Sequence, residues 1–186
     1  MSADDLRSSL VDVASGTITA EPADASLFDR LGLEPSPRVD ADDVERRYLA
    51  LSRHLHPDFQ AGASDDVREL AVQNSALLNE AYTTLLDDQL RLEYLVGRFD
   101  AEALERNKAL DPMFLMESME HSEAVESAAG DRDALERLAK THRAAVDERV
   151  GEAATLLAGD APDVDRAATL LHEARVHRRI LRDCKS

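Results

Sequence analysis

The sequence predicts an all-α protein in which an N-terminal antiparallel helical hairpin is followed by a C-terminal antiparallel three-helix bundle. Apolar residues recur at intervals of three and four along most of the 186 residues, which is the spacing of one face of an α-helix. Clusters of proline, glycine and aspartate divide this pattern into separate segments. No segment shows a sustained alternation of apolar and polar residues, so essentially no β-sheet is expected.

The N-terminal region predicts a flexible tail and then a short helix. Residues 1–24 carry Ser, Asp, Thr, Gly and Pro with weak periodicity, although Leu6 and Leu10 leave a short helix open. Residues 25–33 predict the first helix, and the Glu-Pro-Ser-Pro sequence at 34–37 ends it. Asp40 or Ala41 then starts the next helix, since aspartate is a favoured N-cap.

Two longer helices joined by a sharp loop follow. The first carries one apolar stripe of helical period, formed by Val44, Tyr48, Leu51 and Leu55. Pro57 disfavours helical dihedrals at His56, so this helix should end near Leu55. Ser64 is placed to cap the second helix, whose apolar face continues to Leu85. Antiparallel packing of the two helices would bring the His-Pro-Asp sequence at 56–58 to one tip.

The C-terminal half predicts a separate unit. A break at Asp87 and Asp88 precedes an apolar helical segment that ends near Gly97, so the first unit spans residues 25–98 and residues 99–110 form a connector. Asp111 followed by Pro112 is a favoured helix start. Breaks at 130–131 and 159–162 separate two further helices. Three helices with short turns over residues 111–186 pack most simply as an antiparallel bundle.

The helix that begins after Asp111 carries two apolar patches. At 100° per residue, one face contains Phe114, Ser118, His121, Val125 and Ala128. The other contains Leu115, Met116 and Met119, joined by Glu120 and Glu123. A small bundle can bury one patch, and the methionine-rich one is then a candidate binding surface. The alternative, in which both patches are buried, stays open at this point.

Charge and composition exclude several function classes. The chain has 38 acidic and 22 basic residues and a formal charge of −16, which argues against binding to nucleic acid or to an anionic membrane. No apolar run approaches the length of a transmembrane helix and no secretory signal is visible. One cysteine, Cys184, provides no disulfide framework. We therefore expect a cytoplasmic protein without a metal or other cofactor.

The loop and its flanking helices resemble the J-domain of the DnaJ-like co-chaperones, whose hallmark is His-Pro-Asp between two antiparallel helices. The resemblance implies that His56, Pro57 and Asp58 engage a 70-kDa heat-shock-class chaperone. Arg46, Arg47 and Arg53 lie opposite the apolar stripe, and the resemblance implies that this face meets an acidic surface of the chaperone, with Arg47 and Arg53 matching basic positions of the family. The structural alternative is an ordinary helix-ending turn beside a solvated basic face.

Residues 25 to 183 also resemble the HscB-type co-chaperones of iron–sulfur cluster assembly. The C-terminal domain of that family begins with a segment similar to Phe-Leu-Met-Glu-Ser-Met-Glu at 114–120. The resemblance implies stimulation of ATP hydrolysis by a dedicated, HscA-like chaperone and binding of the IscU-like scaffold protein on which clusters are built. The positions implied to contact the scaffold are Leu115, Met116, Met119, Glu120, Glu123 and, for an aromatic contact in the family, the smaller Val176.

No catalytic motif accompanies these features. The chain has no glycine-rich phosphate loop, nucleophile elbow or paired metal motif, so we expect no enzyme activity and place any ATP turnover in a partner. Two alternatives remain at the level of sequence. One is a J-domain protein that serves a general chaperone through an unrelated helical appendage, and the other is a helical adaptor without a chaperone.

Overall fold

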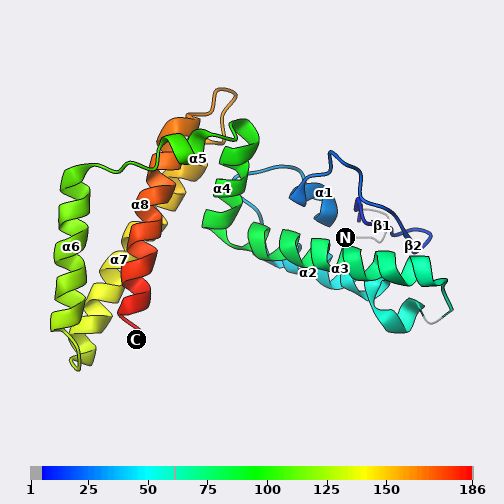
Figure 1. The fold of residues 1–186 in the computed structure, drawn as a ribbon, viewed down its shortest axis with the longest axis horizontal. Coiled ribbons are helices and arrows are strands. Elements are labelled where there is room, and N and C mark those ends of the chain that lie inside the picture. The colour runs from blue at the N-terminus through cyan, green and yellow to red at the C-terminus, as the bar shows by residue number, and fades with distance from the viewer. Residues whose placement is uncertain (1–5, 61, 186) are drawn as a thin grey trace. The chain divides into compact units, whose positions relative to one another are not determined.

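The structure is a computed structural model and describes residues 6–60 and 62–185. Its internal contacts divide the chain into two compact units, one up to Arg91 and one from Leu92. Each unit is helical, as the sequence predicts (Figure 1). The boundary after Arg91 lies within a helix, before residue 98, where the first unit was expected to end.

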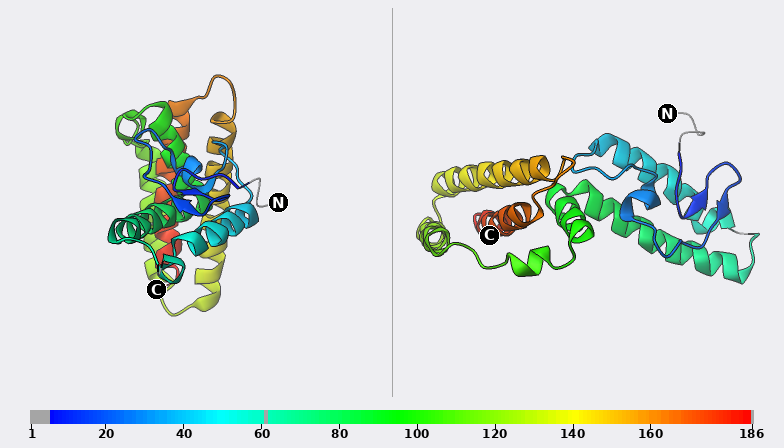
Figure 2. Two further views of the ribbon diagram at one scale, coloured as in Figure 1. Left: turned by 90° about the vertical axis from the view of Figure 1, so that its right-hand side faces the viewer. Right: turned by 90° about the horizontal axis from the view of Figure 1, so that it is seen from above.

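The first unit is built on an antiparallel helical hairpin. Its elements are α1 (Leu27–Leu31), α2 (Ala41–Leu55), a 3-10 turn η2 (Pro57–Gln60) and α3 (Asp65–Leu86). The helices α2 and α3 pack along each other and α1 packs on both (Figures 1 and 2). The buried core comes from the predicted apolar stripes and contains Phe28, Leu31, Val44, Leu51, Leu55, Leu78, Ala81 and Leu85.

The predicted ends of α2 are confirmed. The Asp40 side chain accepts a hydrogen bond from the amide of Asp42 at the start of the helix. At the other end His56 has φ −69° and ψ 137°, an extended conformation that the following proline imposes. The sequence after Pro57 forms the short turn η2 where an irregular loop was expected.

The prediction of a flexible tail is corrected for residues 6–24, and residues 1–5 lie outside the described part of the chain. Strands β1 (Val11–Asp12) and β2 (Thr17–Ile18) form an antiparallel hairpin in which Val11 pairs with Ile18. Leu6 and Leu10 are buried, and Leu10 lies in no helix. On α3, the buried Asn74 donates Nδ2 hydrogen bonds to the carbonyls of Leu10 (2.9 Å) and Thr19 (2.8 Å). These contacts span more than 50 residues, so local periodicity could not reveal them.

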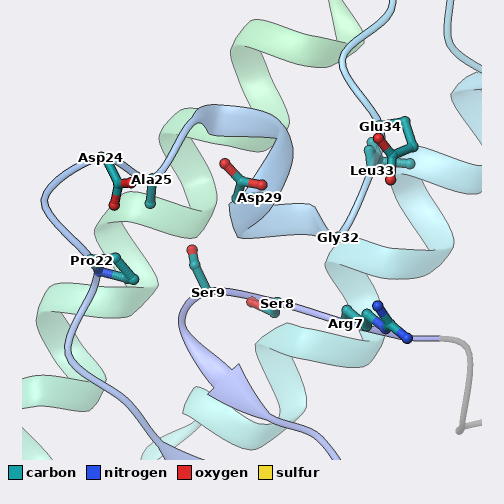
Figure 3. A pocket seen from close by; sticks show the side chains of 10 residues that line it. All are labelled: Arg7, Ser8, Ser9, Pro22, Asp24, Ala25, Asp29, Gly32, Leu33 and Glu34. Carbon is teal, nitrogen blue, oxygen red and sulfur yellow. The ribbon is translucent and has the colours of Figure 1, made fainter.

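The N-terminal segment also runs against the end of α1. Gly32 has a φ of 64°, and a Cβ placed on it would meet the Arg7 carbonyl oxygen at 1.7 Å. Only glycine fits such a left-handed position at so close an approach. Beside this crossing lies a pocket of about 460 Å³ with a mixed polar lining, including Ser9, Asp24 and Glu34 (Figure 3).

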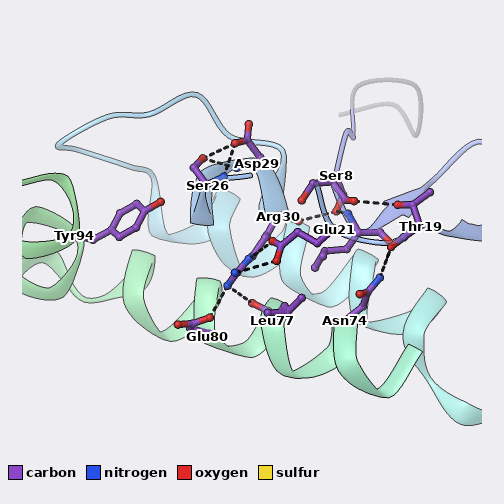
Figure 4. A network of polar contacts seen from close by, with 12 residues as sticks. Ser8, Thr19, Glu21, Ser26, Asp29, Arg30, Asn74, Leu77, Glu80 and Tyr94 are labelled. Carbon is purple, nitrogen blue, oxygen red and sulfur yellow. Dashed lines mark hydrogen bonds and ion pairs between the residues drawn. The ribbon is translucent and has the colours of Figure 1, made fainter. Parts of the chain in front are cut away.

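Arg30 joins three parts of the first unit. Its guanidinium pairs with Glu21 (2.5 Å) of the N-terminal segment and with Glu80 (2.5 Å) of α3, and it donates to the Leu77 carbonyl (3.3 Å). The arginine side chain is 11% exposed, which reduces solvent screening of these charges. Figure 4 shows this network between α1 and α3. It explains why residues 6–24 pack as part of the unit.

The second unit begins within α4 (Asp88–Phe99), which extends beyond the expected end at Gly97. The predicted break is confirmed, because the Asp87 carboxylate caps α4 by accepting from the amide of Gln89 (2.9 Å). Arg175 pairs with Glu93 of α4, and a ring nitrogen of His172 bonds to a carbonyl in α5 (Ala103–Arg106). These contacts attach α4 and α5 to the C-terminal bundle, so the contact boundary precedes residue 98.

The predicted three-helix bundle is confirmed. It consists of α6 (Pro112–Ser127), α7 (Arg132–Leu156) and α8 (Val164–Asp183). Asp111, Asp131 and Asp163 each cap the helix that follows. Helices α7 and α8 pack along most of their length, and α6 packs against α8 (Figures 1 and 2). The fully buried residues of α8 include Leu170, Leu171, Ala174 and Ile180.

Candidate interaction surfaces

The His-Pro-Asp corner is exposed at the tip of the first unit. The His56 side chain is 57% exposed and that of Asp58 is 87% exposed. The Asp58 amide donates to Nδ1 of His56 (3.2 Å), and the Phe59 amide donates to the His56 carbonyl (3.0 Å). The Asp58 carboxylate lies 3.6 Å from the same ring nitrogen and accepts no backbone amide of the described residues. Backbone bonds therefore hold the corner while its imidazole and carboxylate face solvent.

The three predicted cations of α2 occupy different environments. Arg46 is 57% exposed and pairs with Asp43 (2.9 Å), and Arg53 is exposed. Arg47 is only 13% exposed, pairs with Asp43 (2.8 Å) and donates to the Gly32 carbonyl (2.7 Å). Arg47 is thus committed to holding the end of α1. The exposed basic face contains Arg46 and Arg53.

A pair of stacked tyrosines holds α2, which carries this basic face, against α3. The rings of Tyr48 and Tyr82 stack with centroids 4.1 Å apart, and the Tyr48 hydroxyl donates to Asn79 (2.8 Å). Stacked aromatic pairs are worth about 1 kcal/mol beyond the area that they bury. The pair therefore keeps the exposed face of α2 in a defined position relative to α3.

On α6 the structure separates the two apolar patches. The face containing Ser118 and Val125 is buried, at 5% and 7% exposure. The other face stays open, with Leu115 at 43%, Met116 at 57% and Met119 at 65% exposure. Of the two alternatives left open by the sequence, the structure therefore supports burial of one patch only.

A cavity of about 370 Å³ lies between this open face and α8. Four of the six residues predicted to contact a scaffold line it, namely Leu115, Met119, Glu123 and Val176, whereas Met116 and Glu120 are exposed outside it. The remaining lining residues are Ser118, which the sequence placed on the other apolar face, and three that the sequence did not single out, Ser122, Glu126 and Arg179. Helical spacing was the available signal, because Glu126 follows Met119 by seven residues and Arg179 follows Val176 by three.

Three histidines meet behind this face, inside the bundle. The rings of His121 and His142 are 4.9 Å apart, and Nδ1 of His142 lies 3.0 Å from Nδ1 of His177. Burial is the main cause that lowers the pKa of His177 to about 4, and the nearby Arg149 lowers it further. Burial also lowers the pKa of His142. Sequence spacing pointed to packing for His142, but it could not reveal its pairing with His177.

These histidines do not form a metal site with the described residues around them. Across residues 6–60 and 62–185, no three His, Cys, Asp or Glu side chains are arranged to hold a metal ion. Within the same ranges, none of the helices has both the length and the hydropathy that crossing a bilayer requires.

Comparison with known proteins finds relatives of one family. Residues 110–185 match the family model described as the HSCB C-terminal oligomerisation domain. The chain is 34% identical over 137 residues to a co-chaperone protein HscB homolog of Vibrio vulnificus, which covers 68% of this chain and 80% of that relative. A homolog from Vibrio cholerae is 39% identical over 109 residues, and this match spans 64% of that relative, less than two thirds of its length.

Solved structures agree with these sequence matches. The chaperone HscB from Vibrio cholerae aligns with a TM-score of 0.77 at 29% identity, over 87% of this chain and 96% of that one. The human co-chaperone protein HscB aligns with a TM-score of 0.78 at 26% identity, over 91% of this chain and 85% of that one. The likeness therefore extends over both helical units.

Proposed function

The chain belongs to the HscB family of co-chaperones, and on this basis we propose that it links a 70-kDa heat-shock-class chaperone to the scaffold protein of iron–sulfur cluster assembly. The observation that carries the proposal is the exposure of two surfaces. The His-Pro-Asp corner is open on the first unit, and the apolar face of α6 is open on the second. Each matches the residues that the family resemblance assigns to one partner.

The chaperone contact in this proposal involves the tip and the basic face of α2. His56 and Asp58 offer a hydrogen-bonding corner, while Arg46 and Arg53 meet an acidic surface and mainly set association rate and orientation. Arg47 contributes indirectly by holding α1. To stimulate ATP hydrolysis, the corner has to bind one state of the chaperone more tightly than another, since a ligand shifts an equilibrium only by its differential affinity. The ATP turnover belongs to the chaperone, and this chain acts without being an enzyme.

The scaffold contact in this proposal is centred on α6. Leu115, Met116 and Met119 present flexible apolar side chains, which suit an irregular partner surface, and Glu120 and Glu123 form a charged border. When both partners are bound to one chain, the second encounter becomes intramolecular. Such linkage gives an effective concentration near the millimolar range for a short connection, so the scaffold with its cluster and the ATPase meet more readily than they would as separate molecules.

The first test replaces the imidazole at the tip. We predict that His56→Gln abolishes stimulation of the chaperone ATPase, because glutamine cannot reproduce the ring that accepts from the Asp58 amide. Steady-state ATPase rates with and without the variant measure this. Scaffold binding and far-ultraviolet circular dichroism should be unchanged, and His54→Gln is the neighbouring control. Full stimulation by His56→Gln would show that the tip is not the activating element.

The second test truncates the open face of α6. Replacement of Leu115, Met116 and Met119 together by alanine should weaken scaffold binding at least about tenfold, as expected when central apolar contacts are lost. Isothermal titration calorimetry with the scaffold measures the affinity. Val72→Ala removes an equally exposed apolar side chain from α3 and serves as the control. A large loss of helicity in the triple variant would instead mean that these side chains support the bundle.

A further inference from the structure

A further cavity, of about 480 Å³, opens at one end of the C-terminal bundle, between the first half of α7 and the residues that follow α8. It shares no lining residue with the cavity beside α6, and none of the residues proposed to contact the chaperone or the scaffold lines it. Its volume lies in the range of roughly 300–1,000 Å³ that small-molecule sites occupy. A ligand of this cavity would therefore be distinct from the two proposed partners.

Three cationic side chains line this cavity, Arg132 and Arg143 of α7 and Lys185 beyond α8. Arg132 and Arg143 are separated by about three helical turns, so they lie on the same side of α7. All three cations are exposed, and none makes an ion pair or a side-chain hydrogen bond with the described residues. Several other arginines of this unit are paired with carboxylates, as Arg149 is with Glu173. The three cations at the cavity are therefore available to an anion.

The charge around this cavity is opposite in sign to the charge of the whole chain. Residues 132–143 contain four basic and two acidic residues, and residues 175–185 contain five basic and one acidic residue, whereas the formal charge of the chain is −16. Among the described residues that line the cavity, the one carboxylate is that of Glu136. Charges more than about 8 Å away are largely screened at physiological salt, so the local cations decide which ligands the cavity attracts.

The floor of the cavity is apolar and belongs to the bundle core. Leu135 and Ala139 of α7 pack against a buried cluster that includes Ile180 and Cys184, and Leu135, Ala139 and Cys184 also line the cavity. Burial and the neighbouring Asp183 carboxylate raise the pKa of the Cys184 thiol, so the thiol is uncharged at neutral pH. An ion pair formed over such a floor is less screened by water than a pair on a fully exposed surface.

We propose that this cavity binds a small molecule that carries two or more phosphate or carboxylate groups. Arg132 and Arg143 hold the anionic oxygens through the forked hydrogen bonds that guanidinium groups form with both kinds of anion, and Lys185 contributes a third positive charge. Three cations and the Glu136 carboxylate give the lining a formal charge of +2, which matches a ligand with two negative charges. The apolar floor contacts the rest of the molecule.

The first test uses Cys184, the only cysteine of the chain, as a reporter of this cavity. Its thiolate attacks one sulfur of dithiobis(nitrobenzoate), a dianion, which forms a mixed disulfide and releases the coloured thionitrobenzoate. The uncharged dithiodipyridine reacts in the same way. Replacing Arg132, Arg143 and Lys185 together by glutamine should slow the dianionic reagent about tenfold, which is the lower range of electrostatic steering, and leave the rate of the uncharged reagent unchanged.

The matched control removes the same number of positive charges from positions outside the lining. Arg137→Gln/Lys140→Gln/Arg166→Gln changes three exposed cations of α7 and α8 and should keep the wild-type rates with both reagents. An equal slowing of the dianionic reagent in both triple variants would mean that only the net charge of the chain matters, and it would overturn the proposal.

The second test measures binding without the thiol. Pyrophosphate and citrate, each compared at the same ionic strength set with NaCl, should bind the wild-type chain saturably in isothermal titration calorimetry. The glutamine variant of Arg132, Arg143 and Lys185 should bind them at least about tenfold more weakly, since hydrogen bonds to charged groups are lost. The tighter of the two ligands identifies phosphate or carboxylate as the preferred group. No binding of either ligand to the wild type, or equal binding to the variant, overturns the proposal whether or not Cys184 reacts.

Discussion

His142 and His177, the histidine pair inside the bundle, are stable there only with uncharged imidazole rings. His142 is 1% exposed and His177 is 6% exposed, and their Nδ1 atoms share one hydrogen bond. Burial disfavours the imidazolium form, which is why the pKa of both side chains is lowered. The other ring nitrogen of each has no partner among the described residues. The pair is therefore well suited to neutral pH and poorly suited to acid.

The lowered pKa of His177 predicts how stability depends on pH. In the unfolded chain its pKa is near 6.5, and in the folded chain it is about 4. Between these values the unfolded state binds more protons, so the free energy of unfolding is unaffected above about pH 6.5 and falls as pH falls toward 4. The loss should be on the order of 3 kcal/mol. Urea denaturation followed by circular dichroism at several pH values measures it.

The control for this prediction removes the titrating rings. The double variant His142→Leu/His177→Leu should show a shallower loss of stability between pH 6.5 and 4, whereas His172→Gln, which changes a histidine outside the cluster, should keep the slope of the wild type. An identical slope in the double variant would mean that other groups control the acid sensitivity. Hydrogen bonds from Arg106 lower the pKa of Asp100 and of Asp165 below the ordinary aspartate range, so these carboxyl groups act below this window.

At the scale of elements, the N-terminal segment completes the first unit. It supplies buried apolar side chains, including Leu6, Leu10 and Val11, and an acidic partner for Arg30. If the segment is absent, Asn74 of α3 loses its hydrogen bonds to the Leu10 and Thr19 carbonyls, and Arg30 of α1 loses Glu21 while keeping Glu80. A buried polar group that loses its hydrogen bonds costs about 1–3 kcal/mol. The segment therefore stabilises the hairpin instead of trailing from it.

This arrangement predicts the effect of deleting residues 1–24. The free energy of unfolding of the first unit should fall by roughly 3 kcal/mol or more, because apolar burial and the bonds to Asn74 are lost together. Hydrogen exchange of the α1 and α3 amides measures the change in this unit, and the amides of α7 and α8 provide the internal control. Unchanged protection of α1 and α3 would mean that the segment adds nothing to the stability of the unit.

At the scale of the whole molecule, screening of charge by salt should have opposite effects on stability and on association with the chaperone. The formal charge of −16 produces repulsion within the folded chain, which salt screens. The proposed chaperone contact uses Arg46 and Arg53, whose attraction for an acidic surface salt weakens. The same change in ionic strength should therefore favour the folded state and disfavour the encounter.

Raising NaCl from about 0.05 M to about 0.5 M, which shortens the screening length from more than 10 Å to less than 8 Å, tests this directly. The melting temperature should rise, while the association rate with the chaperone should fall. Thermal melts and stopped-flow binding measure the two effects. The variant Arg46→Gln/Arg53→Gln, which removes both positive charges, should lose most of the salt dependence of the rate and keep most of that of the melt. Parallel changes in both quantities would contradict this account.

Much of the fold follows from local sequence. Helix ends at Asp40, Leu55, Asp87 and Asp111 were predicted because caps and prolines act on the residues beside them. The all-α class and the three-helix bundle were predicted because helical periodicity is repeated in every long segment. The two faces of α6 could also be separated by arithmetic on one helix. The interactions that set these helix ends and apolar faces join residues about one helical turn apart in the sequence.

The features that the sequence did not reveal depend on residues far apart in the chain. Residues 6–24 show weak periodicity along the sequence, and they pack because their apolar side chains are buried and because Asn74 and Arg30 bond to them from α3 and α1. In the sequence Arg47 is one of three similar cations. The structure shows that it differs from the other two, because it is largely buried and bonds to the end of α1.

By itself, then, the sequence determined where the helices begin and end and which faces are apolar, since those depend on neighbouring residues. Only the tertiary structure decided which apolar face of α6 is covered, that Val176 borders a cavity with Glu126 and Arg179, and that His142 meets His177. Each of these depends on how separate helices pack, which is a property of distance in space and not of spacing along the chain.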